Sequence, residues 1–213
     1  MASNFPTALD ELVTNQSFVD GTSIVQAAPW NKIQDAVDKL QAKVGVDGSS
    51  VVSSIDFLLE RNYVKLIDLK GNVAGGTSPS AAWTTRTLNT KSHDVGNLCT
   101  LSSNLFTLEP GTYRIHASAP ATNVHGHIAR LWNDTTSAEV ILGTTAWASV
   151  SVYTNTRSFI SGLFEAEEDE EFKISHYTEY SKNPHGLGEK SGHTSNIYTV
   201  VELWRIGPTG ILT

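Results

Sequence analysis

The sequence predicts a mainly β protein: a jelly-roll β-sandwich preceded by an extended N-terminal arm and a short helical segment of the helix-turn-helix kind. From Trp83 to Ile206, short runs of alternating apolar and polar residues recur between turn residues, and no helix-length stretch separates them. Before this region, apolar residues over 30–44 follow helical spacing. About eight to ten strands of this length are typical of a sandwich or a jelly roll.

Composition excludes several classes of protein. The 213 residues carry a formal net charge of −7, and 39% are hydrophobic, which is typical of a globular protein rather than a disordered one. No cluster of Lys and Arg forms a surface for nucleic acid, and no apolar run approaches the roughly 20 residues of a membrane span. A single cysteine, Cys99, excludes an intrachain disulfide and is expected to be a small buried side chain. We therefore expect neither nucleic acid nor a membrane as a partner.

The helical segment carries a heptad stripe. Its apolar residues are spaced three, four, three and four apart: Trp30, Ile33, Val37, Leu40 and Val44. Pro29 suits a first helical turn, and Gly45 suits the position after the last. So short a helix is marginal in water by itself, so the stripe predicts either self-association or packing on the helix's own domain. A second helix is expected over 51–59.

Residues 1–28 read as an extended arm with scattered apolar anchors, which lies on another subunit or protein, or folds back on its own domain. The glycine-rich stretch 70–82 is a candidate linker, or else a loop between strands. We accordingly predict an arm and helical segment over 1–70 and a jelly-roll domain over 71–213.

The run DAVDKLQAKVGVDGSSVVSSIDFLL (35–59) resembles a segment near the N-terminus of many tailed-bacteriophage virion proteins, and FPTALDEL (5–12) resembles their opening. The matching residues are Asn31, Ala36, Val37, Leu40, Gln41, Lys43, Val44, Gly45, Val46, Asp47, Gly48, Ser49, Val51, Ser54, Ile55, Asp56 and Leu58. Such proteins often begin this helix with a histidine-rich motif. Here Ala27-Ala28-Pro29-Trp30-Asn31 stands instead, so nothing that depends on those histidines carries over. The resemblance implies a virion component.

Strands are predicted at Asn62–Leu69, Trp83–Leu88, Leu98–Leu108 (one or two), Thr112–Ala119, His125–Trp132, Val140–Leu142, Ala148–Tyr153, Ser158–Phe164, Glu171–Tyr177 and Ile197–Ile206. The stretches PGTYRIHAS, RSFISGLFEAEEDEEFKISH and IYTVVELWRI resemble the strand rhythm of the C1q/tumour-necrosis-factor type of jelly roll. This resemblance implies a domain that often assembles as a trimer.

The last predicted strand is mostly apolar on both faces. One face would carry Ile197, Thr199, Val201, Leu203 and Arg205, and the other Tyr198, Val200, Glu202, Trp204 and Ile206. A sandwich strand covers one face with its own core, so the second face favours a partner subunit. We predict self-association through Tyr198, Val200 and Trp204.

Seven histidines raise the question of a metal site. His125 and His127 would share one face of a strand, and His116 precedes them as a third candidate ligand. No carboxylate or cysteine accompanies them at a motif spacing, so we expect surface or interface histidines and assign no metal, no cofactor and no catalytic residue. The acidic run over 165–171 is expected to be a solvated hairpin tip rather than a calcium site or a contact for a basic partner.

The polar loop 178–195, with His185 and His193, is a candidate contact for a receptor or a neighbouring subunit, or is disordered. We expect a homotrimeric capsid decoration or cement protein that binds the major capsid protein, assembled in the host cytoplasm, and not an enzyme. The alternative is a short tail fibre or adsorption protein, bound to a tail or baseplate protein, that recognises a host glycan or protein. Exposed Trp132 and Trp147 would favour the alternative. A polysaccharide-degrading enzyme would need a pair of carboxylates, which no motif supplies.

Overall fold

The computed structural model describes residues 62–210 and 212, the helix Ala27–Val44 with its side chains from Ile33 onward, and the short stretches 19–20, 23–24 and 54–55. The chain divides into two compact units, Met1–Arg61 and Asn62–Thr213. In the first unit, β1 (Val19–Asp20) pairs antiparallel with β2 (Ser23–Ile24), and α1 (Ala27–Val44) confirms the predicted helix. The predicted second helix and most of the predicted arm lie outside the described residues.

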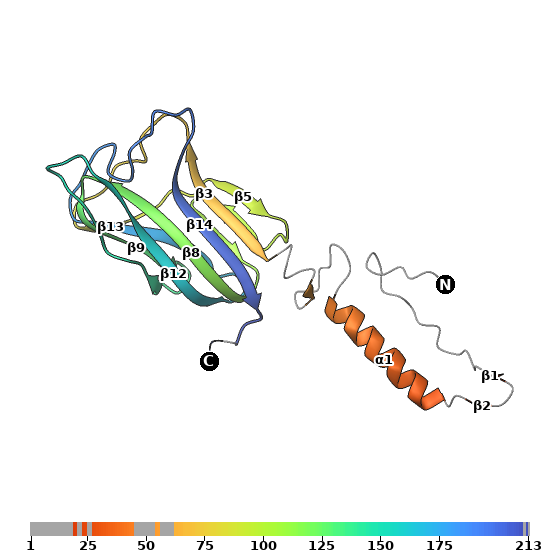
Figure 1. Ribbon diagram of the computed structural model, residues 1–213. Coiled ribbons are helices and arrows are strands. Elements are labelled where there is room, and N and C mark those ends of the chain that lie inside the picture. Colours follow the sequence, from red (N-terminus) through yellow and green to blue (C-terminus); the bar gives the residue numbers. More distant parts are fainter. Residues whose placement is uncertain are drawn as a thin grey trace. The chain divides into compact units, whose positions relative to one another are not determined.

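The second unit, called the β unit below, consists of two antiparallel sheets (Figure 1). The five-stranded sheet has the order β12 (Asn155–Ala166), β8 (Gly111–Thr122), β14 (Asn196–Gly207), β3 (Tyr63–Lys70) and β5 (Thr90–Asp94). The seven-stranded sheet has the order β10 (Ala138–Leu142), β9 (His125–Asn133), β13 (Glu171–Thr178), β7 (Leu105–Leu108) and β6 (Cys99–Ser102). In addition, β11 (Ala146–Ala148) pairs with β9, and β4 (Ala82–Thr85) pairs with β13.

The connections make this sandwich a jelly roll, which confirms the predicted fold class. From β7 onward the chain crosses to the other sheet at β8, returns at β9, and crosses again at β12, β13 and β14. Alternation along β8 places Tyr113, Ile115 and Ala117 in the core and leaves Arg114 and His116 exposed, as predicted. The core also holds a row of stacked or tilted rings: Tyr113, Phe164, Phe172 and Phe106.

Three details differ from the sequence predictions. The unit boundary falls before β3 and not after it, because β3 pairs with both β14 and β5. The edge strand β5 was not predicted, because its sequence TKSHD is polar throughout. The strand predicted at Ala148–Tyr153 is wrong apart from its first residue, since β11 covers Ala146–Ala148 and a turn follows it. The stretch 71–81 agrees with one of the two predicted alternatives: it is a loop of the β unit, joined to the loop after β13 by hydrogen bonds such as Gly75 N to Gly188 O (2.9 Å).

No helix among the described residues is both long and apolar enough to cross a membrane.

Candidate interaction surfaces

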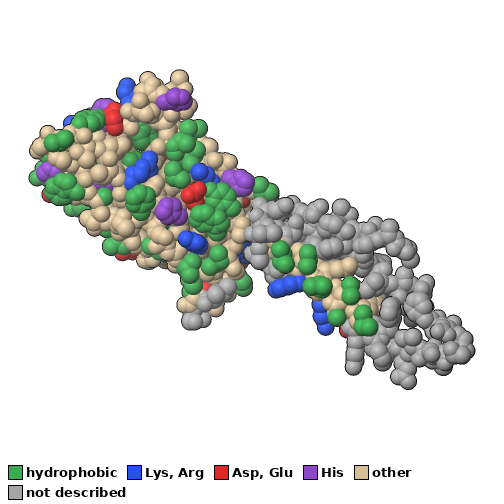
Figure 2. All heavy atoms as spheres, viewed as in Figure 1, with side chains coloured by type: hydrophobic (Ala, Val, Ile, Leu, Met, Phe, Trp, Pro, Cys, Tyr) green, Lys and Arg blue, Asp and Glu red, His purple; other side chains and the backbone are tan. Residues whose placement is uncertain are grey.

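The apolar stripe of α1 is open to solvent. Ile33 is 56% exposed and Leu40 is 63% exposed, while Val37 and Val44 are half-buried. The most shielded described side chain of this helix is Gln34, at 8%. Figure 2 shows hydrophobic side chains on the visible surface of the helix. The fifth predicted stripe residue, Trp30, belongs to α1, but its side chain lies outside the described residues. Of the four stripe residues whose side chains are described, two are therefore largely exposed and two are partly covered.

A second apolar surface is the outer face of the five-stranded sheet, where patches of hydrophobic side chains alternate with histidines and with basic and acidic side chains (Figure 2). Strand register aligns its side chains in cross-strand rows. One row consists of Leu163, Arg114, Trp204 and Tyr63, and the next of Ser161, His116, Glu202, Lys65 and His93. Leu163 is 48% exposed, and Phe159, two rows along on β12, is 43% exposed. We call this surface the outer sheet face.

Polar contacts hold the centre of the outer sheet face. Glu202 accepts a hydrogen bond from the Tyr63 hydroxyl (2.6 Å), and Lys65 Nζ lies 3.5 Å from the same carboxylate oxygen. Burial and the neighbouring Glu202 raise the pKa of Tyr63 above its ordinary value, so Tyr63 remains a donor at neutral pH. The Tyr63 ring also contacts Trp204 and His93, each at 5.2 Å between ring centroids. The face is thus ordered before any partner binds.

Aromatic and charged side chains also pair between neighbouring strands of this face. The His116 ring stacks on Phe159 at 6.1 Å, and the Arg114 guanidinium lies 5.9 Å from the Trp204 ring centroid. Sequence reasoning singled out Val200 and Trp204, which both lie half-buried on this face, but missed Phe159, Leu163 and Arg114. The sequence did contain a signal for Phe159 and Leu163, because residues four apart in a strand lie on the same face of the sheet.

The prediction for Tyr198 is wrong. A register shift between Ile197 and Val200 breaks the alternation of β14, so Tyr198 and Thr199 are both buried while Ile197 is 48% exposed. The Tyr198 hydroxyl donates to Val73 O (2.5 Å), and its ring edge lies close to Gly188. Tyr198 therefore anchors the loops of its own chain and does not lie on the outer sheet face.

The central residues of the loop 178–195 pack against the β unit. Gly186, Leu187 and Gly188 are buried, and Leu187 O accepts a hydrogen bond from Arg86 Nη2 (2.8 Å). His185 Nδ1 lies 2.6 Å from Glu189 Oε2, which also accepts a hydrogen bond from the Tyr153 hydroxyl. His193 is exposed, and its Nδ1 accepts a hydrogen bond from Ser195 N (3.2 Å). The two predicted contact histidines thus lie in the same loop in different settings.

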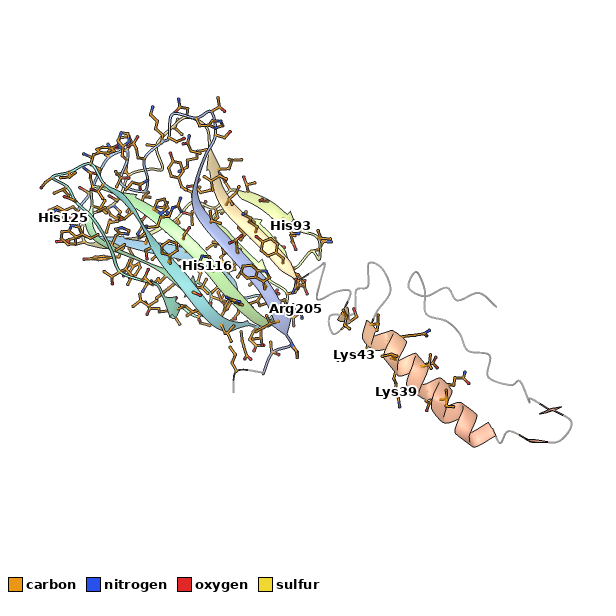
Figure 3. The ribbon with its side chains drawn as sticks, viewed as in Figure 1. Lys39, Lys43, His93, His116, His125 and Arg205 are labelled. Atoms are coloured by element: carbon orange, nitrogen blue, oxygen red, sulfur yellow. The ribbon has the colours of Figure 1, made fainter. Side chains whose placement is uncertain are left out.

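The three histidines considered as metal ligands do not meet. His127 points into the core, whereas His116 is exposed on the outer face of the other sheet and His125 lies at one end of the β unit (Figure 3). The acidic run forms the turn between β12 and β13, where the Glu170 carboxylate accepts hydrogen bonds from Asn133 Nδ2 and Glu167 N. Across the residues that the structure describes, no group of three His, Cys, Asp or Glu side chains is arranged to hold a metal ion.

A buried polar chain runs between the two sheets, which no sequence pattern signalled. The fully buried Arg86 donates from Nε to Thr199 Oγ1 (2.8 Å) and from Nη1 to Pro120 O (3.2 Å). Its Nη1 also lies 3.5 Å from His176 Nδ1, and the chain continues from His176 Nε2 to His127 Nδ1 (3.0 Å) and from His127 Nε2 to Thr156 Oγ1 (2.8 Å). Because arginine can only donate, His176 Nδ1 must accept.

The acceptor role of His176 Nδ1 determines the direction of the remaining hydrogen bonds in this network. A neutral His176 then carries its proton on Nε2 and donates to His127, which in turn donates to Thr156. Burial lowers the pKa of His127 to about 4, with a further contribution from Arg86, and burial also lowers the pKa of His176 well below its ordinary value. Burial lowers the pKa of Arg86 to about 10, with Asp68 opposing that shift, so Arg86 keeps its charge at neutral pH. The network stabilises the fold by satisfying buried polar groups of both sheets.

The two tryptophans that would favour a receptor-binding role differ. The Arg130 guanidinium lies between Trp83 (3.8 Å to the ring centroid) and Trp132 (4.0 Å), so the face of Trp132 is covered. Trp147, in contrast, is 58% exposed. Trp132 is half-buried, so Trp147 is the more exposed ring of the pair.

Of the comparisons with known proteins, only the one with solved structures finds similarities. No family model and no curated protein matches the chain. Among solved structures it is similar to murine APRIL, with a TM-score of 0.47, 8% identity, and coverage of 69% of this chain and 100% of that one. It is also similar to the globular domain of the zebrafish complement 1qA protein (TM-score 0.46, 14% identity, coverage 70% and 100%). A third is the vertex protein P5 of PRD1 (TM-score 0.44, 14% identity, coverage 70% and 99%). The jelly-roll assignment rests on the strand order and connections of this chain.

Proposed function

We propose that the protein is a structural component of a tailed-phage virion that works as a homotrimer. The observation that carries this proposal is the pair of partly exposed apolar surfaces, the stripe of α1 and the outer sheet face. On the stripe, Ile33 and Leu40 are each more than half exposed, and burial of such a side chain contributes about 1.5–3 kcal/mol. Self-association covers both surfaces, and closed symmetry is its usual form.

Within the virion, we propose decoration of the head, where the protein binds the major capsid protein and stabilises the shell. The likeness of residues 35–59 to a phage virion segment supports a virion component. This role needs no catalysis, and assembly would take place in the host cytoplasm.

The mass of the full chain in solution tests the association. We expect the mass of three copies, and we expect Ile33→Asp with Leu40→Asp to lower it, because each change places a charge in the seam. The matched control changes two exposed polar residues of the same helix, Asp35→Ser and Lys39→Ser, and should leave the mass unchanged. A monomer mass for the unchanged chain would contradict the trimer. A trimer that survives the double aspartate change would exclude α1 as the seam.

A second candidate function is that of a short tail fibre or adsorption protein, which the exposed Trp147 favours. Labelling intact virions with an antibody against the β unit separates the two candidates. Label over the head supports decoration, and label at the tail tip supports adsorption and overturns the decoration proposal.

A further inference from the structure

A row of three residues crosses the seven-stranded sheet at the end marked by His125 in Figure 3. Trp147 of β11 pairs with Gly126 of β9, and on the other side of Gly126 the chain leaves β13 at Glu179, whose N–H donates to Gly126 O (2.9 Å). The row therefore places the Trp147 indole and the Glu179 carboxylate on either side of Gly126, which has no side chain. A Cβ on Gly126 would lie 3.2 Å from Glu179 Oε2 and 3.9 Å from the Trp147 ring, so the glycine lets both groups approach each other.

The indole is a fixed platform. One of its faces stacks on the His125 imidazole, with ring centroids 4.7 Å apart and planes at 15°. Tyr180 contacts the same imidazole edge-on at 4.5 Å. His125 itself adopts a left-handed backbone conformation (φ 58°), which costs free energy in a non-glycine residue and marks a constrained position. Since Trp147 is nevertheless 58% exposed, its open area lies on the face away from His125.

The Glu179 carboxylate is held in place by one hydrogen bond and has a second oxygen that can accept others. Glu179 Oε2 accepts a hydrogen bond from Gly126 N (3.0 Å), which holds the side chain over the row. Among the described residues, no donor contacts the other carboxylate oxygen. A surface pocket of about 290 Å³ begins at this point and is lined by Gly126, His127, Ile128, Thr145, Tyr177 and Glu179; Trp147 is not part of this lining and adjoins it through its pairing with Gly126. This volume is close to the lower limit of ligand pockets, roughly 300 Å³, which suits a single small ring.

From this arrangement we infer a carbohydrate-binding site that takes a neutral hexopyranose unit of a glycan. The negative face of an indole attracts the polarised C–H groups on one side of a sugar ring, and a fixed carboxylate accepts hydrogen bonds from its hydroxyls. An aromatic cage for a quaternary ammonium group is excluded by His125, which fills the space between Trp147 and Tyr180. An acidic sugar is disfavoured by Glu179 and by the net charge of −7.

Titration by nuclear magnetic resonance of the full chain tests the inference. The five tryptophans give five indole N–H signals, and the signal lost in Trp147→Phe belongs to Trp147. The probes are the methyl pyranosides of glucose, galactose, mannose and N-acetylglucosamine, with methyl glucuronide and choline for comparison. We expect at least one neutral pyranoside to shift the Trp147 signal saturably, and methyl glucuronide to bind more weakly than methyl glucoside.

Two variants connect the shift to the site. Glu179→Gln should weaken binding about tenfold, the loss expected when a charge-assisted hydrogen bond becomes a neutral one. Glu168→Gln, which removes an exposed carboxylate in the turn between β12 and β13, is the matched control and should bind as the unchanged protein does. Absence of a saturable shift with all four neutral pyranosides would overturn the inference. So would an affinity that Glu179→Gln leaves unchanged, or a Trp147 response to choline alone.

Discussion

Acidification should destabilise the β unit through the two buried histidines. The chain Arg86, His176, His127, Thr156 passes hydrogen bonds in one direction and needs both imidazoles neutral. A proton added to His127 Nδ1 would face the donor Nε2 of His176, and a proton added to His176 would face the arginine. Neither added proton would have an acceptor within this hydrogen-bond network. Both histidines therefore bind a proton more weakly in the folded protein than in the unfolded chain.

The magnitude follows from the pKa of His127, which burial lowers from 6.5 to about 4 in the folded protein. As the pH falls below 6.5, the unfolded chain binds a proton that the folded chain does not. The stability is therefore fully present above pH 6.5 and is lost progressively as the pH falls towards 4. At pH 5 the loss from His127 is about 2 kcal/mol, from about 1.36 kcal/mol for each of about 1.5 pH units below 6.5. The lowered pKa of His176 acts in the same direction.

The assay is urea unfolding at pH 7.5 and pH 5, followed by tryptophan fluorescence at one fixed protein concentration because association is linked to stability. The quantity compared is the difference in unfolding free energy between the two pH values. His127→Gln should reduce that difference by about 2 kcal/mol, since one of the two buried titrating groups is removed. Asp68, whose pKa burial raises, contributes the opposite pH dependence, and comparing variants cancels it. His193→Gln, in the exposed part of the loop, is the control. An equal pH difference in His127→Gln and the unchanged protein would refute the reasoning.

Three further predictions follow from single residues. Arg86→Leu should lower the free energy of unfolding by about 3–5 kcal/mol, measured by the same assay at pH 7.5, because it leaves three buried acceptors, Thr199 Oγ1, Pro120 O and Leu187 O, without their donor. Gly143→Ala should cost about 1–3 kcal/mol, because the new Cβ would lie 2.6 Å from two backbone oxygens, whereas Gly71→Ala, with 3.8 Å to its nearest neighbour, should be tolerated. The Cys99 thiol should resist Ellman's reagent at pH 8 until the protein unfolds, because burial raises its pKa to about 12.

The two-residue alternation of apolar and polar side chains, together with the turn residues, was enough to predict most of the strands. The alternation of Tyr113, Ile115 and Ala117 against Arg114 and His116 requires one buried face, and the structure buries it. The alternation rule gave the wrong face for Tyr198, because a bulge adds a residue to β14 and no local pattern in IYTVV indicates it. Strand β5 was not predicted, because it is a strand through its pairing with β3 and not through its own composition.

The interior polar chain could not be predicted at all. Arg86 lies in a stretch of threonines that reads as an ordinary strand end, and its acceptors come from residues between 34 and 113 positions away. The row at Gly126 is similar, because Trp147 and Glu179 meet there only through the order β11, β9, β13. Chemistry that depends on side chains from three distant segments becomes visible only when sheet order and register are known.

Sheet order also explains why β14 is apolar on both sides. It is the central strand of five, so Val201 and Leu203 face the core while Val200 and Trp204 face outward in the middle of the outer sheet face. A central position is the hardest for a loop of the same chain to cover. Trp204 and Val200 are only half-buried there, and exposed Leu163 and Phe159 on β12 extend the same surface. A surface of this kind, on a strand with neighbours on both edges, is the one that neighbouring copies of the chain would cover in the trimer that we propose.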